Sequence, residues 1–105
     1  MDEGIDTGDI LSSVDINIPP NTTYPELSNM CAISGAQVLL DTLKNIENIR
    51  PIAQSSIENI TPSYTKKIMK QDGLLCPQDS VDTIYAKFLT YISWPSLYLD
   101  RKSVV

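Results

Sequence analysis

Prolines divide this 105-residue chain into a few segments. The helices and strands that these segments can form are too few to enclose a core. Before Pro19, apolar and polar residues alternate from Ile10 to Ile18, which is typical of a strand with one buried face. Helical spacing occurs in only two later segments, which end near Pro51 and Pro95. A lone strand has no partner for its hydrogen bonds, and each amphipathic helix needs a surface to cover. The sequence therefore predicts an α/β fragment, not a complete domain.

The longer helix is expected from Pro25 to Ile49. It begins at Thr23 and Glu26, which have the spacing of a capping box, and Gly35 in its middle predicts close approach of another element. A shorter helix is expected after Ser80, which is a suitable N-cap residue. The apolar stripes of the two helices are Ala36, Leu39, Leu40, Leu43 and Ile46, and Val81, Ile84, Tyr85, Phe88 and Ile92. Uncovered stripes of this kind predict poor solubility or self-association.

The composition narrows the possible chemistry. The chain has no histidine, so it holds neither a Ser-His-Asp nor a Cys-His couple, and acid–base chemistry is left to carboxylates, Lys, Cys or Tyr. A net charge of −5 argues against a chain dedicated as a whole to nucleic acid or anionic membranes. The charge is uneven: residues 1–22 hold five acidic side chains and no basic one, whereas basic side chains predominate after residue 60.

The remaining features favour a soluble cytoplasmic protein. The first residues do not resemble a signal peptide, and no apolar stretch approaches the roughly 20 residues that a membrane span needs. Cys31 and Cys76 lack the spacing of a metal site, so no metal is expected.

One short motif suggests a protease. Asp6-Thr7-Gly8 has the Asp-Thr-Gly pattern that opens the active-site loop of aspartic proteases, and a mechanism with two carboxylates would need no histidine. Those proteases have a small residue after the glycine, where this chain has Asp9, and the sequence contains no Gly-rich flap. A dimeric aspartic protease is therefore an unfavoured alternative.

A longer resemblance covers most of the chain. Residues 1–11, Met-Asp-Glu-Gly-Ile-Asp-Thr-Gly-Asp-Ile-Leu, are similar to the Met-Asp-x-Gly-Leu-Asp-Thr-Gly-Asp-Met-Leu segment of methionyl-tRNA formyltransferases. Residues 34–43 are similar to the family's Gly-Ala-x-Leu-Leu-x-Thr-Leu helix, and residues 64–73 to its Tyr-Ala-x-Lys-Ile-x-Lys-Glu-Asp-Gly segment. Residues 80–95, which end in Trp-Pro, are similar to the start of its C-terminal domain. The four blocks are collinear.

The resemblance implies transfer of a formyl group from 10-formyltetrahydrofolate to the amino group of methionyl initiator tRNA. By position in the motif, Asp6 is the catalytic carboxylate, and Thr7 and Gly8 belong to the loop that faces the folate. The lysines that match the family's tRNA-facing linker are Lys66, Lys67 and Lys70. The implied domains are the end of a Rossmann-like catalytic domain (1–50), a linker (51–78) and the start of a truncated OB-like domain (79–105).

The family's catalytic Asn and His have no counterpart in this sequence. We therefore expect a truncated or split formyltransferase that is inactive alone and needs an upstream formyltransferase half as its partner. The alternative is a small accessory module that binds tRNA. DNA encoding an Asn-x-His segment just upstream would favour the enzyme, and an unrelated neighbouring gene would favour the module.

Overall fold

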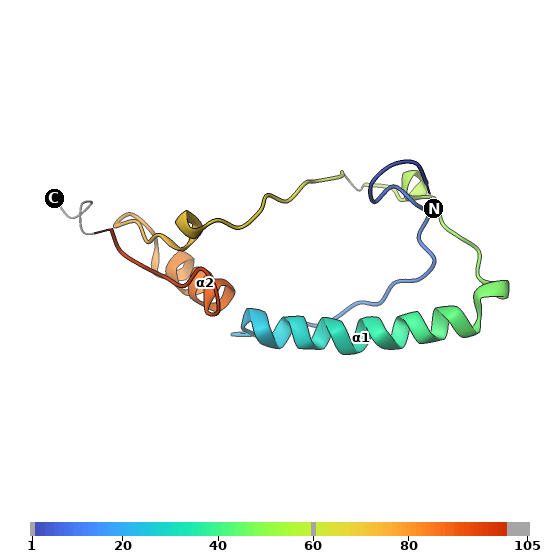
Figure 1. Cartoon of the computed structure of the whole chain (residues 1–105), viewed down its shortest axis with the longest axis horizontal. Helices are drawn as coiled ribbons and strands as arrows, with labels where there is room; N and C mark the ends of the chain where they lie inside the picture. The colour runs from blue at the N-terminus through green and yellow to red at the C-terminus, as the bar shows by residue number, and fades with distance from the viewer. Residues whose placement is uncertain (1, 60, 101–105) are drawn as a thin grey trace. The chain divides into compact units, whose positions relative to one another are not determined.

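The computed structural model describes residues 2–59 and 61–100. Its elements are the helices α1 (Tyr24–Lys44) and α2 (Val81–Tyr91) and three short 3-10 turns, η1 (Ile46–Asn48), η2 (Gln54–Ser56) and η3 (Lys70–Gly73) (Figure 1). The chain divides into two compact units. Unit 1 consists of Met1–Ile16 and Met30–Tyr64, and unit 2 of Asn17–Asn29 and Thr65–Val105. The domain boundaries expected from the sequence remain a prediction, and residues 101–105 lie outside the described part.

Helix α1 confirms the longer helical prediction over most of its length. The α-helix ends at Lys44, before the expected Ile49, because Asn45 leaves the helical conformation and its side-chain amide donates to the Asp41 carbonyl at 2.8 Å. The short turn η1 follows directly. Gly35 has no atom within 4 Å of the position that a Cβ would occupy, so the expected close approach is not found among the described residues.

The start of α1 differs in detail from a capping box. The Glu26 carboxylate accepts the backbone N–H of Thr23 at 2.8 Å, as expected, but the Thr23 hydroxyl also donates to that carboxylate at 2.8 Å. In this bond the hydroxyl is a donor to the carboxylate, whereas in a capping box it would accept a backbone N–H of the first helical turn. Both hydrogen bonds favour the charged carboxylate, and they lower the pKa of Glu26, with the backbone bond having the larger effect.

The strand expected between Ile10 and Ile18 does not form in the described residues. Only Ile10 is paired, in an antiparallel bridge with Ile52, through N–H to carbonyl bonds of 2.8 and 2.9 Å. In antiparallel register the residues after Ile10 would face those before Ile52, and residues 14–16 would face residues 46–48, which form η1. The connector thus supplies one pairing residue where a strand needs several.

Helix α2 and its cap confirm the second helical prediction. The Ser80 side chain accepts the backbone N–H of Thr83 at 3.1 Å, as the sequence indicated. The helix ends at Tyr91, and turn residues lead to a cis Trp94–Pro95 peptide bond.

Backbone contacts around Gly73 organise unit 2. The Gly73 carbonyl accepts the Tyr98 N–H at 3.0 Å, and the Tyr98 carbonyl accepts the Leu75 N–H at 2.9 Å. Gly73 is buried, and a Cβ added to it would collide with the backbone oxygen of Ser96. A residue without a side chain is therefore needed where these two backbone segments meet.

A single ion pair connects α2 to this junction in the described part of unit 2. Lys87 Nζ lies 2.7 Å from Asp79 Oδ2 and donates to the Leu74 carbonyl at 3.1 Å, while Asp79 also accepts the Cys76 N–H at 3.0 Å. The hydrogen bond from Lys87 lowers the pKa of Asp79, and the same bond raises the pKa of Lys87. Helix α2 is thereby linked to the segment that precedes it.

We expect the stability of unit 2 to fall at both ends of the pH scale. The contribution of Asp79 is present above its unfolded pKa of about 4 and is lost as the pH falls through its lower folded value. The contribution of Lys87 is present below about pH 10 and is lost as the pH rises through its raised value. Urea unfolding followed by the fluorescence of Trp94 should show a plateau between these limits. Asp79→Asn should reduce the acid-side loss and Asp15→Asn, in unit 1, should not; equal profiles for all three proteins would contradict this account.

The apolar side chains of both helices remain accessible. Among the described residues no hydrophobic side chain is buried, and on α1 Leu39 and Leu43 are each 58% exposed. The exposed apolar faces expected from the sequence are thus present, and the self-association that they imply stays a prediction. None of the described helices has the length and hydropathy to cross a membrane.

Candidate functional site

Asp6, Thr7 and Gly8 lie in an irregular loop of unit 1. Asp6 has a φ of 57°, in the left-handed region that Asp and Asn tolerate better than most residues. Its carboxylate is exposed and makes no hydrogen bond within the described residues. The side chain predicted to be catalytic is therefore free to meet a ligand.

A glutamine that the sequence did not single out closes this loop. The Gln54 side-chain amide donates to the carbonyls of Asp6 at 2.9 Å and Gly8 at 2.6 Å. The bridge between Ile10 and Ile52 explains this, since in antiparallel register the residue two after Ile52 faces the residue two before Ile10. No motif in the sequence marks Gln54, because its role depends on a pairing 42 residues apart in the chain.

A second set of contacts lies within the loop. The Thr7 hydroxyl donates to Asp2 Oδ2 at 3.1 Å, and Asp2 Oδ1 accepts the Glu3 N–H at 2.7 Å. Thr7 therefore supports the loop from inside, while Gln54 fixes its backbone from the connector.

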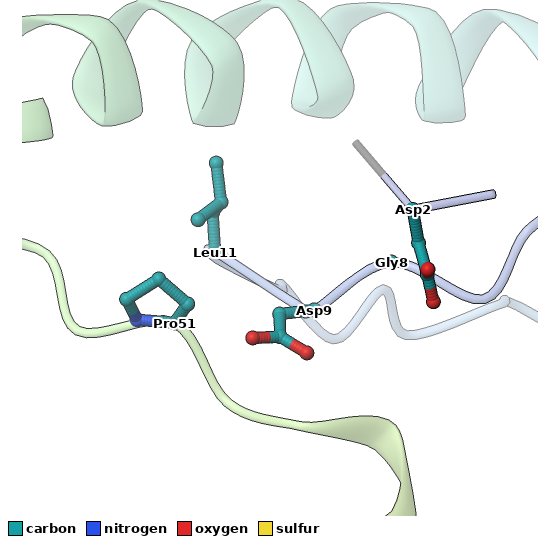
Figure 2. A pocket seen from close by; sticks show the side chains of 5 residues that line it. All are labelled: Asp2, Gly8, Asp9, Leu11 and Pro51. Atoms are coloured by element: carbon teal, nitrogen blue, oxygen red, sulfur yellow. The ribbon is translucent and has the colours of Figure 1, made fainter.

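An open hollow of about 560 Å³ adjoins the loop. Its lining includes Asp2, Gly8, Asp9, Leu11 and Pro51 (Figure 2). In this view the Leu11 side chain points toward the helical ribbon, whereas the carboxylates of Asp2 and Asp9 point away from it. The structure thus places Gly8 at the hollow; Asp6 and Thr7 belong to the same loop, but the lining does not include them. Among residues 2–59 and 61–100, no cluster of three His, Cys, Asp or Glu side chains could hold a metal ion.

The three predicted tRNA-binding lysines belong to unit 2. Lys66 and Lys67 lie in a segment without helix or strand, and Lys70 begins η3. All three are exposed, and none forms an ion pair or hydrogen bond with a described residue. Their charges are therefore available to an external anion.

Comparison with known proteins gives the family. The methionyl-tRNA formyltransferase of Rickettsia canadensis is 47% identical over 100 residues, which are 95% of this chain. The chain is related to methionyl-tRNA formyltransferases. The enzymes of that name from Rickettsia prowazekii and Rickettsia typhi are 45% and 43% identical over the same share of the chain. The chain spans about a third, 32%, of the length of each of these formyltransferases.

The other comparisons add no further relationship. No family model matches the chain, and no solved structure matches it significantly. The formyltransferase relatives confirm the resemblance seen in the sequence, and nothing found supports an aspartic protease or a separate accessory module. The Rossmann-like and OB-like architecture implied by the family remains a prediction.

Proposed function

We propose that this chain supplies the Asp-Thr-Gly loop and the basic linker of a methionyl-tRNA formyltransferase. The observation that carries the proposal is the 47% identity to the Rickettsia canadensis enzyme across 95% of this chain. The reaction is transfer of a formyl group from 10-formyltetrahydrofolate to the amino group of methionyl initiator tRNA. The proposal places this chemistry in the cytoplasm, with folate and tRNA as the ligands.

Formyl transfer needs a deprotonated amine, a stabilised oxyanion and a route for the proton. Asp6 provides a carboxylate that can accept a proton and orient the group that donates it. Gln54 holds the Asp6 loop by donating to two of its backbone carbonyls. The chain has no histidine, and the family's catalytic Asn has no counterpart in it, so both groups must come from the part of the enzyme that this chain does not cover. We therefore expect no transfer by this chain alone.

From their position in the family motif, we assign Thr7 and Gly8 to the side of the loop that faces the folate. The Gly8 carbonyl is already engaged by Gln54 at 2.6 Å, and Gly8 lines the hollow beside Asp9 and Leu11. A lining that combines apolar and polar groups suits a ligand that combines a flat ring system with polar substituents.

A chimera tests whether this chain supplies a working part of a formyltransferase. In it, the 100 residues that match here replace their counterparts in the Rickettsia canadensis enzyme, which supplies the remaining sequence. We expect the chimera to formylate methionyl-tRNA with 10-formyltetrahydrofolate, while the chain alone gives only the background rate. Turnover by the chain alone would contradict the proposal.

The lysines should govern tRNA affinity and its dependence on salt. In the chimera, replacing Lys66, Lys67 and Lys70 with Ala should raise the KM for methionyl-tRNA and leave kcat at saturating tRNA nearly unchanged. For every phosphate that is no longer neutralised, the slope of log affinity against log salt should fall by about 0.7 to 0.9. Lys44→Ala is the control, because Lys44 is exposed but lies at the end of α1 in unit 1. An unchanged salt slope in the triple variant would remove these lysines from the tRNA site.

A further inference from the structure

Unit 2 contains a small apolar hollow of about 200 Å³. Its lining includes Tyr24 at the start of α1, Ile68 from the lysine segment, Thr90 from α2, and Ser93 and Trp94 after that helix. Tyr24 and Trp94 are 56% and 57% exposed. Two aromatic rings at one opening are thus accessible to a ligand.

The polar groups at this hollow suit a flat heterocycle. The Thr90 hydroxyl donates to the Ala86 carbonyl at 2.8 Å, which leaves its oxygen able to accept a hydrogen bond. The Ser93 side chain is exposed, and its hydroxyl makes no hydrogen bond within the described residues. Aromatic faces with one or two hydroxyls beside them can stack on a base and contact its edge.

The segment that contributes Ile68 to the hollow is positively charged, whereas the carboxylate of Glu26, two residues after Tyr24, accepts hydrogen bonds from Thr23. Ile68 lies between Lys67 and Lys70, and residues 59–71 contain three lysines and no acidic side chain. The nearest carboxylates that follow along the chain are engaged elsewhere, because Asp72 accepts the Met69 N–H at 2.6 Å and Asp79 pairs with Lys87. A phosphate backbone that followed the lysine segment would therefore place a base at the aromatic rings that adjoin Ile68.

We propose that this hollow binds one unpaired base of an RNA strand, stacked on Trp94 and Tyr24, while the lysines contact the flanking phosphates. The proposal rests on the proposed function for the lysines and extends it from the phosphate backbone to a base. It predicts that RNA with accessible bases binds more tightly than duplex RNA of the same length.

Trp94 is the only tryptophan in the chain, so its emission reports on the hollow directly. The probes are an unstructured single-stranded RNA of mixed adenine and uracil and the same strand annealed to its complement, each titrated into the full chain. We expect the single strand to quench Trp94 emission and the duplex to bind through salt-dependent contacts without comparable quenching.

Variants separate stacking from charge. With labelled RNA, Trp94→Leu should weaken single-strand binding about tenfold, since stacking on an aromatic ring contributes about 1–3 kcal/mol per base. Trp94→Phe keeps an aromatic ring and should restore most of the affinity. Tyr24→Leu tests the second aromatic ring if Trp94→Leu disturbs the far-ultraviolet circular dichroism, and neither substitution should change duplex binding.

The results distinguish the two proposals. Equal binding of both RNAs without quenching would overturn the base site and leave the lysine contacts intact. If neither the single strand nor the duplex bound at low salt, both the base site and the lysine contacts would be overturned. A Trp94 spectral shift that depends on protein concentration and prevents quenching by RNA would overturn the base site and assign the hollow to a second copy of the chain.

Discussion

Asp6→Asn in the chimera should lower kcat for formyl transfer by about 10²- to 10⁴-fold, the range typical of a lost acid–base group. The substitution keeps the size of the side chain and removes its capacity to hold a negative charge or accept a proton. Asn tolerates the left-handed backbone of Asp6, at φ 57°, as well as Asp does, so the loop should keep its conformation. The KM for methionyl-tRNA should change little, because the lysines are untouched.

Asp15→Asn is the matched control. Asp15 is exposed, lies in unit 1 as Asp6 does, and is outside the loop closed by Gln54. The kcat of each variant is measured from steady-state rates at saturating substrates. If Asp6→Asn reduced kcat no more than Asp15→Asn, Asp6 would have no part in the chemistry.

Gly73→Ala should destabilise unit 2 by about 1–3 kcal/mol, the usual effect of forcing an extra carbon into a packed position. The added Cβ would meet the Ser96 backbone oxygen and the Pro95 ring. A backbone atom cannot rotate away as a side chain can, so the bonds between Gly73 and Tyr98 and between Leu75 and Tyr98 must lengthen or break. Urea unfolding followed by Trp94 fluorescence measures the loss.

Gly35→Ala is the matched control with the opposite sign. Gly35 lies within α1 and has open space at its Cβ position, so alanine should stabilise the helix by about 0.5–1 kcal/mol. Far-ultraviolet circular dichroism of the chain should show higher helix content. A Gly73→Ala chain as stable as the parent would mean that the contact with Ser96 does not constrain unit 2.

The helices were predictable because their signals are local. Ser80 caps α2 as expected, and Glu26 reaches back to the Thr23 N–H, since both contacts join residues three apart. The predicted strand was wrong because alternation specifies only a buried face, and the residues that would pair with residues 14–16 form η1 instead of a strand. Gly35 was misleading for the same reason: the prediction depended on a neighbour that the described residues do not supply.

In the candidate site, too, the residues of a local motif were predictable and the long-range contacts were not. Asp6, Thr7 and Gly8 could be named because they form a contiguous motif, whereas Gln54 could not, because its bonds to that loop follow from the pairing of Ile10 with Ile52. The lysines were visible as a charge cluster in the sequence. Their freedom from ion pairs with other described residues, and the aromatic hollow beside Ile68, required the structure.

The most direct test of the central claim is the formyl-transfer rate of the chimera measured beside the intact Rickettsia canadensis enzyme and the chain alone. The predicted result is a chimera within about tenfold of the intact enzyme, a difference of about 1.4 kcal/mol in the barrier, and no transfer above background by the chain. A folded chimera that binds methionyl-tRNA but transfers no formyl group would contradict the claim that this chain supplies a working part of the enzyme.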